Sequence, residues 1–313
     1  MLRRIADHLF WTARNLERAE WRARLVDVNY HLLIETFPRD IQPWVPLLAI
    51  FGETEAFKAR YADADESSVL NFFVLDPDNS SSIRNCIKSA RANALSLRHY
   101  ISSELWLDLN TLFLGAEEWT PELFTSPGVF AFFADLKDSF YRISGIQQST
   151  VPRDLAYDFM QVGIMLERAE DVARMLDVKY HFLLPHLDDV GGPVDLLQWA
   201  AVLRSASGLE AYRKRYGNAI GIANVIEILL FDPTFPRSAR FSLDQLEVSL
   251  ARIASHMPEP MPQSVALGEL AAFFNTSKPA ELIKSGLHQS LLHVQEGCAA
   301  ISDEVFQRYL RID

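Results

Sequence analysis

An internal repeat constrains the fold of this chain more than any other feature of its sequence. Residues 16–31 read LERAEWRARLVDVNYH and residues 166–181 read LERAEDVARMLDVKYH, so eleven of sixteen positions are identical at an offset of 150. Self-similarity at a fixed spacing is the signature of a duplicated unit. Further matches at offsets of 155 and 156 pair 57–61 with 212–216, and 69–77 with 225–233.

Both halves of the chain have the pattern of helices. Apolar residues recur at three- and four-residue spacing in two long segments, 2–36 and 153–184. The first has no internal Pro or Gly, and the second has one Gly. We expect further helices at 43–62 and 193–216, short apolar ones ending at Asp76 and Asp232, helices beginning at 80–82 and 236–238, and closing helices at 121–147 and 279–311. The sequence therefore predicts an all-α, compact multi-helix bundle of two interlocked tandem pseudo-repeats, residues 1–150 and 151–313.

The charge balance limits the classes of partner. Asp and Glu number 41 against 30 Lys and Arg, a net charge of −11, and an acidic surface repels phosphate backbones and anionic lipid. We therefore expect neither nucleic acid nor a membrane as a partner. Only two cysteines are present, Cys86 and Cys298, and the N-terminal residues lack the continuous apolar run of a signal peptide. These features predict a cytoplasmic protein.

The duplicated helix carries a stripe of polar residues, which we call the polar stripe. Because same-face neighbours on a helix are three and four residues apart, five polar side chains of the first copy fall on one line between two apolar faces. They recur in the second copy; the members are Glu17, Glu20, Arg24, Asp27 and His31, and Glu167, Glu170, Arg174, Asp177 and His181. Arg18 and Arg168 lie on the opposite flank and are expected to face solvent or a partner, as is the sector near Arg22 and Asn29.

Three interpretations of the polar stripe remain open. The two copies could form a buried network between packed helices, in which every charge needs a partner because an unpaired buried charge costs several kcal/mol. The arginines could instead line a groove for a peptide, an amino acid or a protein terminus, since Arg binds carboxylate bidentately. Carboxylates and His could also bind a metal, but a central Arg24 or Arg174 opposes a cation. We therefore predict no metal and no cofactor.

A second repeated element lies where a helix is expected to begin in each half. Ser-x-Arg occurs in both, and Ser at a helix start is a good N-cap that, with Arg, could also hold an anion. Its residues are Ser82, Arg84, Arg237, Ser238 and Arg240. The chain has no P-loop, dinucleotide glycine motif, Gly-x-Ser-x-Gly elbow or zinc-type spacing, so the sequence indicates no familiar nucleotide-dependent or nucleophilic chemistry.

These motifs together resemble the bacterial Alpha-E family of all-helical domains, named for a Glu-Arg motif. The resemblance runs through MLRRIADHLFW, both Leu-Glu-Arg-Ala-Glu segments, ELWLDLN at 104–110 and Pro-Arg-Ser at 236–238. It implies partners, a circularly permuted ATP-grasp protein and a transglutaminase-like protein, and a role in making or modifying a peptide or amide conjugate. Features of those two enzymes are not visible in this chain.

The expected function is therefore a non-catalytic helical partner or a peptide- or amino-acid-binding subunit of such a system. The alternative is an enzyme of the same pathway that uses the Glu, Arg and Asp residues of the polar stripe for acid–base chemistry on a peptide-like substrate. Replacing Glu20 by Gln separates them, because an acid–base residue affects turnover whereas a structural one affects stability.

Overall fold

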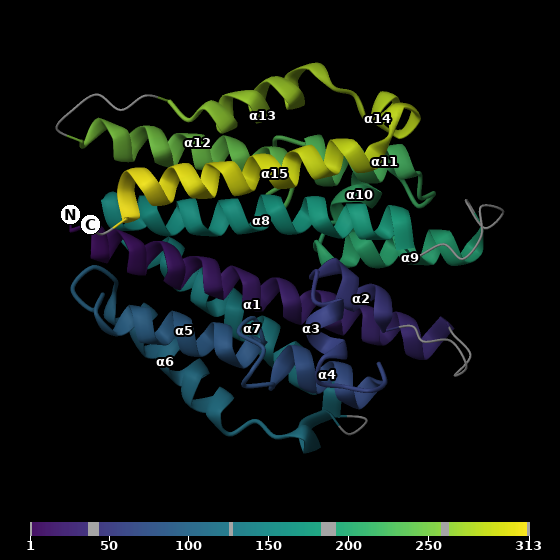
Figure 1. Ribbon diagram of the computed structural model, residues 1–313, viewed down its shortest axis with the longest axis horizontal. Coiled ribbons are helices and arrows are strands. Elements are labelled where there is room, and N and C mark those ends of the chain that lie inside the picture. Colours follow the sequence, from purple (N-terminus) through teal and green to yellow (C-terminus); the bar gives the residue numbers. More distant parts are fainter. Residues whose placement is uncertain (1, 37–43, 125–127, 183–191, 258–262, 312–313) are drawn as a thin grey trace.

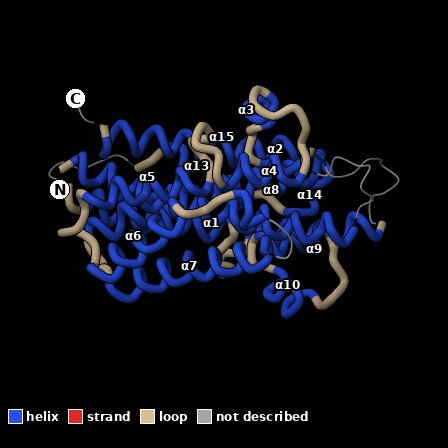
Figure 2. Tube along the Cα trace, turned by 90° about the horizontal axis from the view of Figure 1, so that it is seen from below, coloured by secondary structure: helices blue, strands red, loops and turns tan. Residues whose placement is uncertain are grey.

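The computed structural model describes residues 2–36, 44–124, 128–182, 192–257 and 263–311, and within these ranges it contains helices and loops but no strand (Figure 2). The prediction of an all-α fold is confirmed. The helices of the first half are α1 (Arg3–Thr36), α2 (Val45–Ile50), α3 (Thr54–Lys58), α4 (Glu66–Val74), α5 (Ile83–Leu95), α6 (Ser103–Glu117) and α7 (Gly128–Thr150). Those of the second half are α8 (Leu155–Phe182), α9 (Pro193–Ser205), α10 (Leu209–Tyr216), α11 (Ile222–Ile226), α12 (Ala239–Ser255), α13 (Val265–Thr276), α14 (Pro279–Ser285) and α15 (Leu287–Val305). Among the described residues, no helix is both long enough and apolar enough to cross a membrane.

The two helices that carry the polar stripe, α1 and α8, lie side by side at the centre of the molecule (Figure 1). Helices α5 and α7 pack against α1, and α12 and α15 pack against α8 in the corresponding way. Helices α6 and α13 form outer layers on the two sides. The polar stripe therefore runs through the middle of the bundle rather than along its surface.

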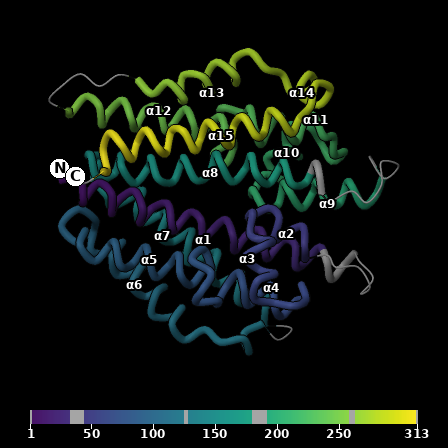
Figure 3. Tube along the Cα trace, viewed as in Figure 1, coloured from purple at the N-terminus to yellow at the C-terminus, as the bar shows by residue number. Residues whose placement is uncertain are grey.

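Each half also packs across the centre. Helix α2 of the first half contacts α8, and α9 of the second half contacts α1. The colours of Figure 3 show the first and last helices beside each other at one end, where Arg3 Nη1 donates to the Arg311 carbonyl oxygen at 2.9 Å. These cross-contacts make one bundle out of the two halves.

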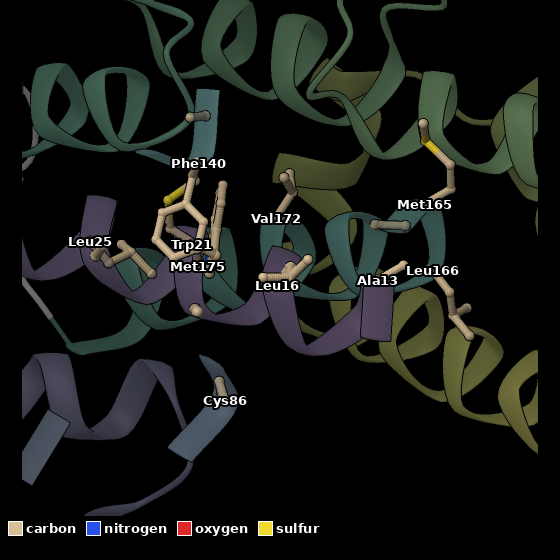
Figure 4. Close-up of a cluster of buried hydrophobic side chains, with 14 of the residues drawn as sticks. Ala13, Leu16, Trp21, Leu25, Cys86, Phe140, Met165, Leu166, Val172 and Met175 are labelled. Carbon is tan, nitrogen blue, oxygen red and sulfur yellow. The ribbon is translucent and has the colours of Figure 1, made fainter. Parts of the chain in front are cut away.

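Apolar side chains from several helices fill the space around α1 and α8. Figure 4 shows Leu16 and Trp21 of α1 near Phe140 of α7 and Met175 of α8, and all four are buried. The backbones of α1 and α8 also approach closely at Gly163, where an added Cβ would lie 2.5 Å from the Phe10 carbonyl oxygen. A side chain there would force the two central helices apart.

The structure divides three helices that the sequence pattern predicted as continuous. Each break is at a residue with positive φ, because a left-handed residue ends an α-helix. The breaks are Gly52 (φ 67°) between α2 and α3, Ser207 (φ 53°) between α9 and α10, and Gly286 (φ 119°) between α14 and α15. Two helices, α6 and α13, were not predicted, and residues 121–124 form a 3-10 turn rather than the start of α7. The helix ends expected near 37–43 and 183–184 lie outside the described residues.

Candidate functional site

Reciprocal ion pairs between the two copies of the Glu-Arg motif form the centre of the molecule. Arg168 donates from Nε and Nη2 to the two carboxylate oxygens of Glu17, at 2.8 and 2.9 Å. In the opposite direction, Arg18 donates to Glu167 at 2.5 and 3.0 Å. The Glu of each copy thus binds the Arg of the other copy, which is the pattern of contacts across a twofold axis.

Each pair of glutamates is bound by additional arginines. Glu20 is paired with Arg24 of its own helix at 2.8 Å and with Arg237, which precedes α12. On the other side Arg14 pairs with Glu167 at 2.5 Å and with Glu170 at 3.0 Å, while Arg174 also pairs with Glu170. Three arginines therefore surround each glutamate pair, and we call these ten side chains the central network: Glu17, Glu20, Glu167, Glu170, Arg14, Arg18, Arg24, Arg168, Arg174 and Arg237.

The arginines keep Glu20 and Glu167 ionised although both side chains are buried. Burial opposes ionisation of Glu20, but the charges of Arg237, Arg24 and Arg168 outweigh it and lower the pKa to about 2. Burial acts in the same way on Glu167, where the paired arginines again lower the pKa to about 2. A carboxylate with so low a pKa is a weak base and is not protonated at neutral pH, so these residues are poorly suited to acid–base catalysis.

Asp171 is a buried carboxyl group beside the central network, and the nearby arginines do not outweigh the effect of its burial. It replaces Trp21 of the first copy and is 5% exposed. Burial and the neighbouring charge of Glu167 raise its pKa well above the ordinary value of 3.8. Its Oδ2 atom has no hydrogen-bond partner among the described residues. The protonated form is therefore favoured inside the bundle.

The positions of several arginines differ from those expected. Arg168 is directed into the network rather than toward solvent, and Arg18 is only 26% exposed at its side chain. Arg22 also lies inside, where it donates to Glu53 at 2.6 and 3.0 Å and stacks over Phe51 at 4.3 Å. The expected solvent face is covered because the segment between α2 and α3 packs onto it.

The C-terminal members of the polar stripe bind different partners from those of the central network. Asp27 accepts from Lys137 Nζ of α7 at 2.6 Å, and His31 lies 3.6 Å from the same carboxylate. In the second half Asp177 lies 2.7 Å from His288 Nδ1 of α15. The side chain of His181 lies outside the described residues.

Beside α1, this part of the stripe borders a cleft of about 540 Å³ between α1, α7 and the end of α9, which we call the α7–α9 cleft. It combines cations and anions: the lining residues are Arg24, Asp27, Val28, His31, Ala134, Lys137, Asp138, Tyr141, Arg204 and Ser207. Because Lys137 is occupied by Asp27, the exposed guanidinium of Arg204 is the cation most accessible to a ligand.

A small hydrogen-bonded group forms one wall of the α7–α9 cleft. Buried Arg24 donates from Nη1 to the Ser207 hydroxyl at 2.8 Å, and its guanidinium lies 4.8 Å from the centre of the Tyr141 ring. Partial burial raises the pKa of Tyr141, but hydrogen bonds from Arg24 and Ser207 and the charge of Arg24 outweigh it and lower the pKa. The Tyr141 hydroxyl is therefore polarised as a hydrogen-bond donor.

The side chains of the Ser-x-Arg elements bind other groups of the protein. Ser82 and Ser238 are N-caps of α5 and α12, accepting from Asn85 and Phe241. The arginines that follow them bind elsewhere: Arg84 donates to the Trp119 carbonyl oxygen, and Arg240 binds Asp244 and Asn275. Only Arg237 reaches the polar stripe. Within the described part of the chain, no group of three or more His, Cys, Asp or Glu side chains is placed to bind a metal ion.

Sequence reasoning missed several residues of these two sites. Arg14 is three residues before Glu17 and continues the polar stripe by one step, so the same helical spacing identifies it. Lys137 and His288 differ by an offset of 151, close to that of the repeat, but the helices that carry them share too little sequence to align. Nothing in the sequence distinguishes Tyr141, Arg204 or Ser207.

Comparison with known proteins identifies relatives of this chain. Residues 1–310 match the profile of Alpha-E, described as a predicted alpha-helical domain with a conserved ER motif. The uncharacterized proteins Mb2597 of Mycobacterium bovis and Rv2567 of Mycobacterium tuberculosis are each 25% identical over 319 residues, covering 95% of this chain and 35% of their own length. The chain thus spans about a third of the length of these curated relatives. No solved structure matches it. The match over nearly every residue shows that this chain belongs to the Alpha-E family of helical domains.

Proposed function

We propose that this chain is a non-catalytic helical subunit that binds a peptide or an amino acid in an amide-forming system. Its partners in this proposal are a circularly permuted ATP-grasp protein and a transglutaminase-like protein, and its location is the cytoplasm. The observation that carries the proposal is the α7–α9 cleft, which presents Arg204 and Lys137 together with Asp27 and Asp138. A site with both signs of charge suits a ligand that carries a carboxylate and an amide or ammonium group.

The central network supports a structural role for most of the polar stripe. Its glutamates are bound by arginines, and the pKa values of Glu20 and Glu167 are about 2. A general acid or base for neutral conditions needs a pKa near the working pH. This argues against the alternative function, an enzyme that uses these carboxylates in acid–base chemistry.

The size of the relatives supports a role beside other proteins. The matched part is 35% of their length, so in those proteins the Alpha-E domain is joined to further polypeptide. A domain that works with others is consistent with a binding or scaffolding subunit. The buried thiols of Cys86 and Cys298 form no disulfide, as expected in a reducing compartment.

Two experiments test this function. Co-expression with the ATP-grasp protein of the same organism should give a complex that survives gel filtration at micromolar concentration, and separate elution would contradict the partnership. Titration of the chain with short peptides, followed by NMR, should shift signals of the cleft residues. Arg204→Ala should remove this binding, whereas Arg213→Ala, an exposed arginine on α10 outside the cleft, should not.

The enzyme alternative has its own test. If Glu20 is an acid–base residue, Glu20→Gln abolishes turnover of a peptide substrate and leaves the unfolding temperature unchanged. Because Glu20 is bound by Arg24 and Arg237, we expect the opposite result, a large loss of stability.

A further inference from the structure

Ser207 occupies a backbone conformation that glycine normally adopts. It follows the last turn of α9 with φ 53°, in the motif where Gly208 N–H bonds to the Leu203 carbonyl oxygen and Ser207 N–H to that of Arg204. Among the described residues it is the only one other than glycine with positive φ. For a residue with a Cβ atom this conformation is unfavourable, and such strain persists where the surroundings require it.

The first half of the chain shows what the same turn looks like without that strain. At the repeat offset of 155, Ser207 corresponds to Gly52, which ends α2 with φ 67°. The backbone hydrogen bonds of the two turns also correspond. In the first half, Glu53 N–H donates to the Leu48 carbonyl oxygen and Gly52 N–H to the Ala49 carbonyl oxygen. One copy of the motif therefore uses the residue that fits without strain, and the other uses serine.

The hydroxyl group is what serine adds to this turn. It accepts from Arg24 Nη1 at 2.8 Å, and the same guanidinium lies 4.8 Å from the centre of the Tyr141 ring. Since the hydroxyl accepts from the guanidinium, its own hydrogen stays available to a neighbouring acceptor. Ser207 thus fixes a buried cation beside an exposed phenol, and all three side chains line the α7–α9 cleft.

Arg204, one turn before Ser207, completes the arrangement. Its exposed side chain lines the same cleft, and the structure describes no ion pair that occupies it. A guanidinium and a polarised hydroxyl donor together match a carboxylate, which accepts charge-assisted hydrogen bonds at both oxygens. Arg24 is 5% exposed at its side chain and bound to Glu20, so it orients the site rather than touching the ligand.

From these observations we propose that the α7–α9 cleft binds the carboxylate of an amino acid or peptide between Arg204 and the Tyr141 hydroxyl. Ser207 is the positioning residue that holds Arg24 against Tyr141, and its left-handed backbone is retained for this purpose. The assignment rests on the proposed function, because that function supplies the peptide-like ligand.

The test compares Ser207→Gly with Ser207→Ala and uses two probes, N-acetyl-Ala-Ala and the same peptide with an amidated C-terminus. Wild type should bind the acid about tenfold more tightly than the amide, as expected for a hydrogen bond to a charged group. In Ser207→Gly the preference should fall by several-fold but not vanish, because Arg204 still attracts the carboxylate while Arg24 and Tyr141 are no longer held in place. Its unfolding temperature should stay within about 2 °C of wild type, because relief of strain offsets the lost hydrogen bond. Ser207→Ala keeps the strain and loses the bond, so it should unfold at a lower temperature than Ser207→Gly.

A spectroscopic measurement separates positioning from simple packing. With ¹³C-labelled tyrosine, NMR titration should show that the pKa of Tyr141 rises in Ser207→Gly, because one of the hydrogen bonds that lower it is gone. An unchanged pKa with an unchanged preference would overturn the role of Ser207. Equal binding of the two peptides by wild type would overturn the carboxylate site alone, and no binding of either at millimolar concentration would overturn the proposed function as well.

Discussion

Replacement of Glu167 by Gln measures how strongly the central network stabilises the fold. The side chain is 4% exposed and accepts hydrogen bonds from Arg14 and Arg18, so the amide leaves two arginines without their shared anion. Its pKa is about 2 in the folded protein against an ordinary 4.5. That difference corresponds to about 3 kcal/mol at neutral pH, since each pH unit is worth about 1.4 kcal/mol. Breaking a buried ion pair by removing one partner typically costs a similar 3–5 kcal/mol.

The sign of the effect predicts its pH dependence. A carboxyl group whose pKa is lowered by folding stabilises the protein above its unfolded pKa and loses this contribution as the pH falls toward the folded pKa. The difference between wild type and Glu167→Gln should therefore be about 3 kcal/mol at pH 7 and shrink to about 1 kcal/mol at pH 3.

Urea denaturation followed by circular dichroism at several pH values gives these free energies of unfolding. Glu210→Gln is the matched control, because Glu210 is paired with Arg213 on α10 but is 74% exposed at its side chain. It should change stability by less than about 0.5 kcal/mol at every pH. A loss below about 1 kcal/mol for Glu167→Gln at pH 7 would refute the argument, as would a loss that does not vary with pH.

Three further variants test separate parts of the packing. Gly163→Ala should destabilise the protein by about 1–3 kcal/mol in the same urea assay, because the new Cβ collides with the Phe10 carbonyl oxygen. Its control is Gly145→Ala on α7, where an added Cβ meets no other atom, and which should stabilise the protein by up to about 1 kcal/mol. Asp171→Asn should gain stability relative to wild type as the pH rises above the ordinary Asp pKa of 3.8, since the unfolded carboxyl ionises there while the folded one, whose pKa is raised, resists ionisation. Arg22→Ala should lose about 2–4 kcal/mol by thermal denaturation, against less than about 0.5 kcal/mol if it faced solvent.

The parts of the fold that the sequence predicted are those governed by local pattern. The two long helices, the N-caps Ser82 and Ser238, and the line of five polar residues follow from spacing along one helix and from the chemistry of serine. None of these depends on which other helix is nearby. The same reasoning correctly placed Glu17 and Glu20 between apolar faces, where the structure buries both.

The choice of partners could not be read in the same way. Whether Glu17 would bind Arg168, Arg24 or a ligand depends on the crossing of α1 and α8, which is set by close backbone approach at Gly163. The prediction that Arg22 faces solvent was wrong, because a turn later in the sequence, which carries Glu53, covers it. The helix break at Ser207 was missed for another reason. Its positive φ is a property of the folded turn, and a serine in the sequence does not predict that conformation.

The two halves of the chain share most charges of the central network but differ around the α7–α9 cleft. The four glutamates occur in both copies, as do Arg18 with Arg168 and Arg24 with Arg174, and the reciprocal pairing requires both copies. Arg14 and Arg237 do not recur, since Ile164 and Ser81 stand at the corresponding positions. The residues that α1 contributes to the α7–α9 cleft recur in the second copy, but those from the end of α9 do not.

At the repeat offset of 155, Arg204 corresponds to Ala49 and Ser207 corresponds to Gly52. A binding role for the whole polar stripe predicts that its surroundings would be retained on both sides. Under the proposed function, we therefore expect a ligand in the α7–α9 cleft and not at the equivalent place in the second half, where Arg204 and Ser207 have no counterpart of the same chemistry. Arg24 belongs to both sets, since Glu20 fixes it in the central network and Ser207 connects it to the cleft.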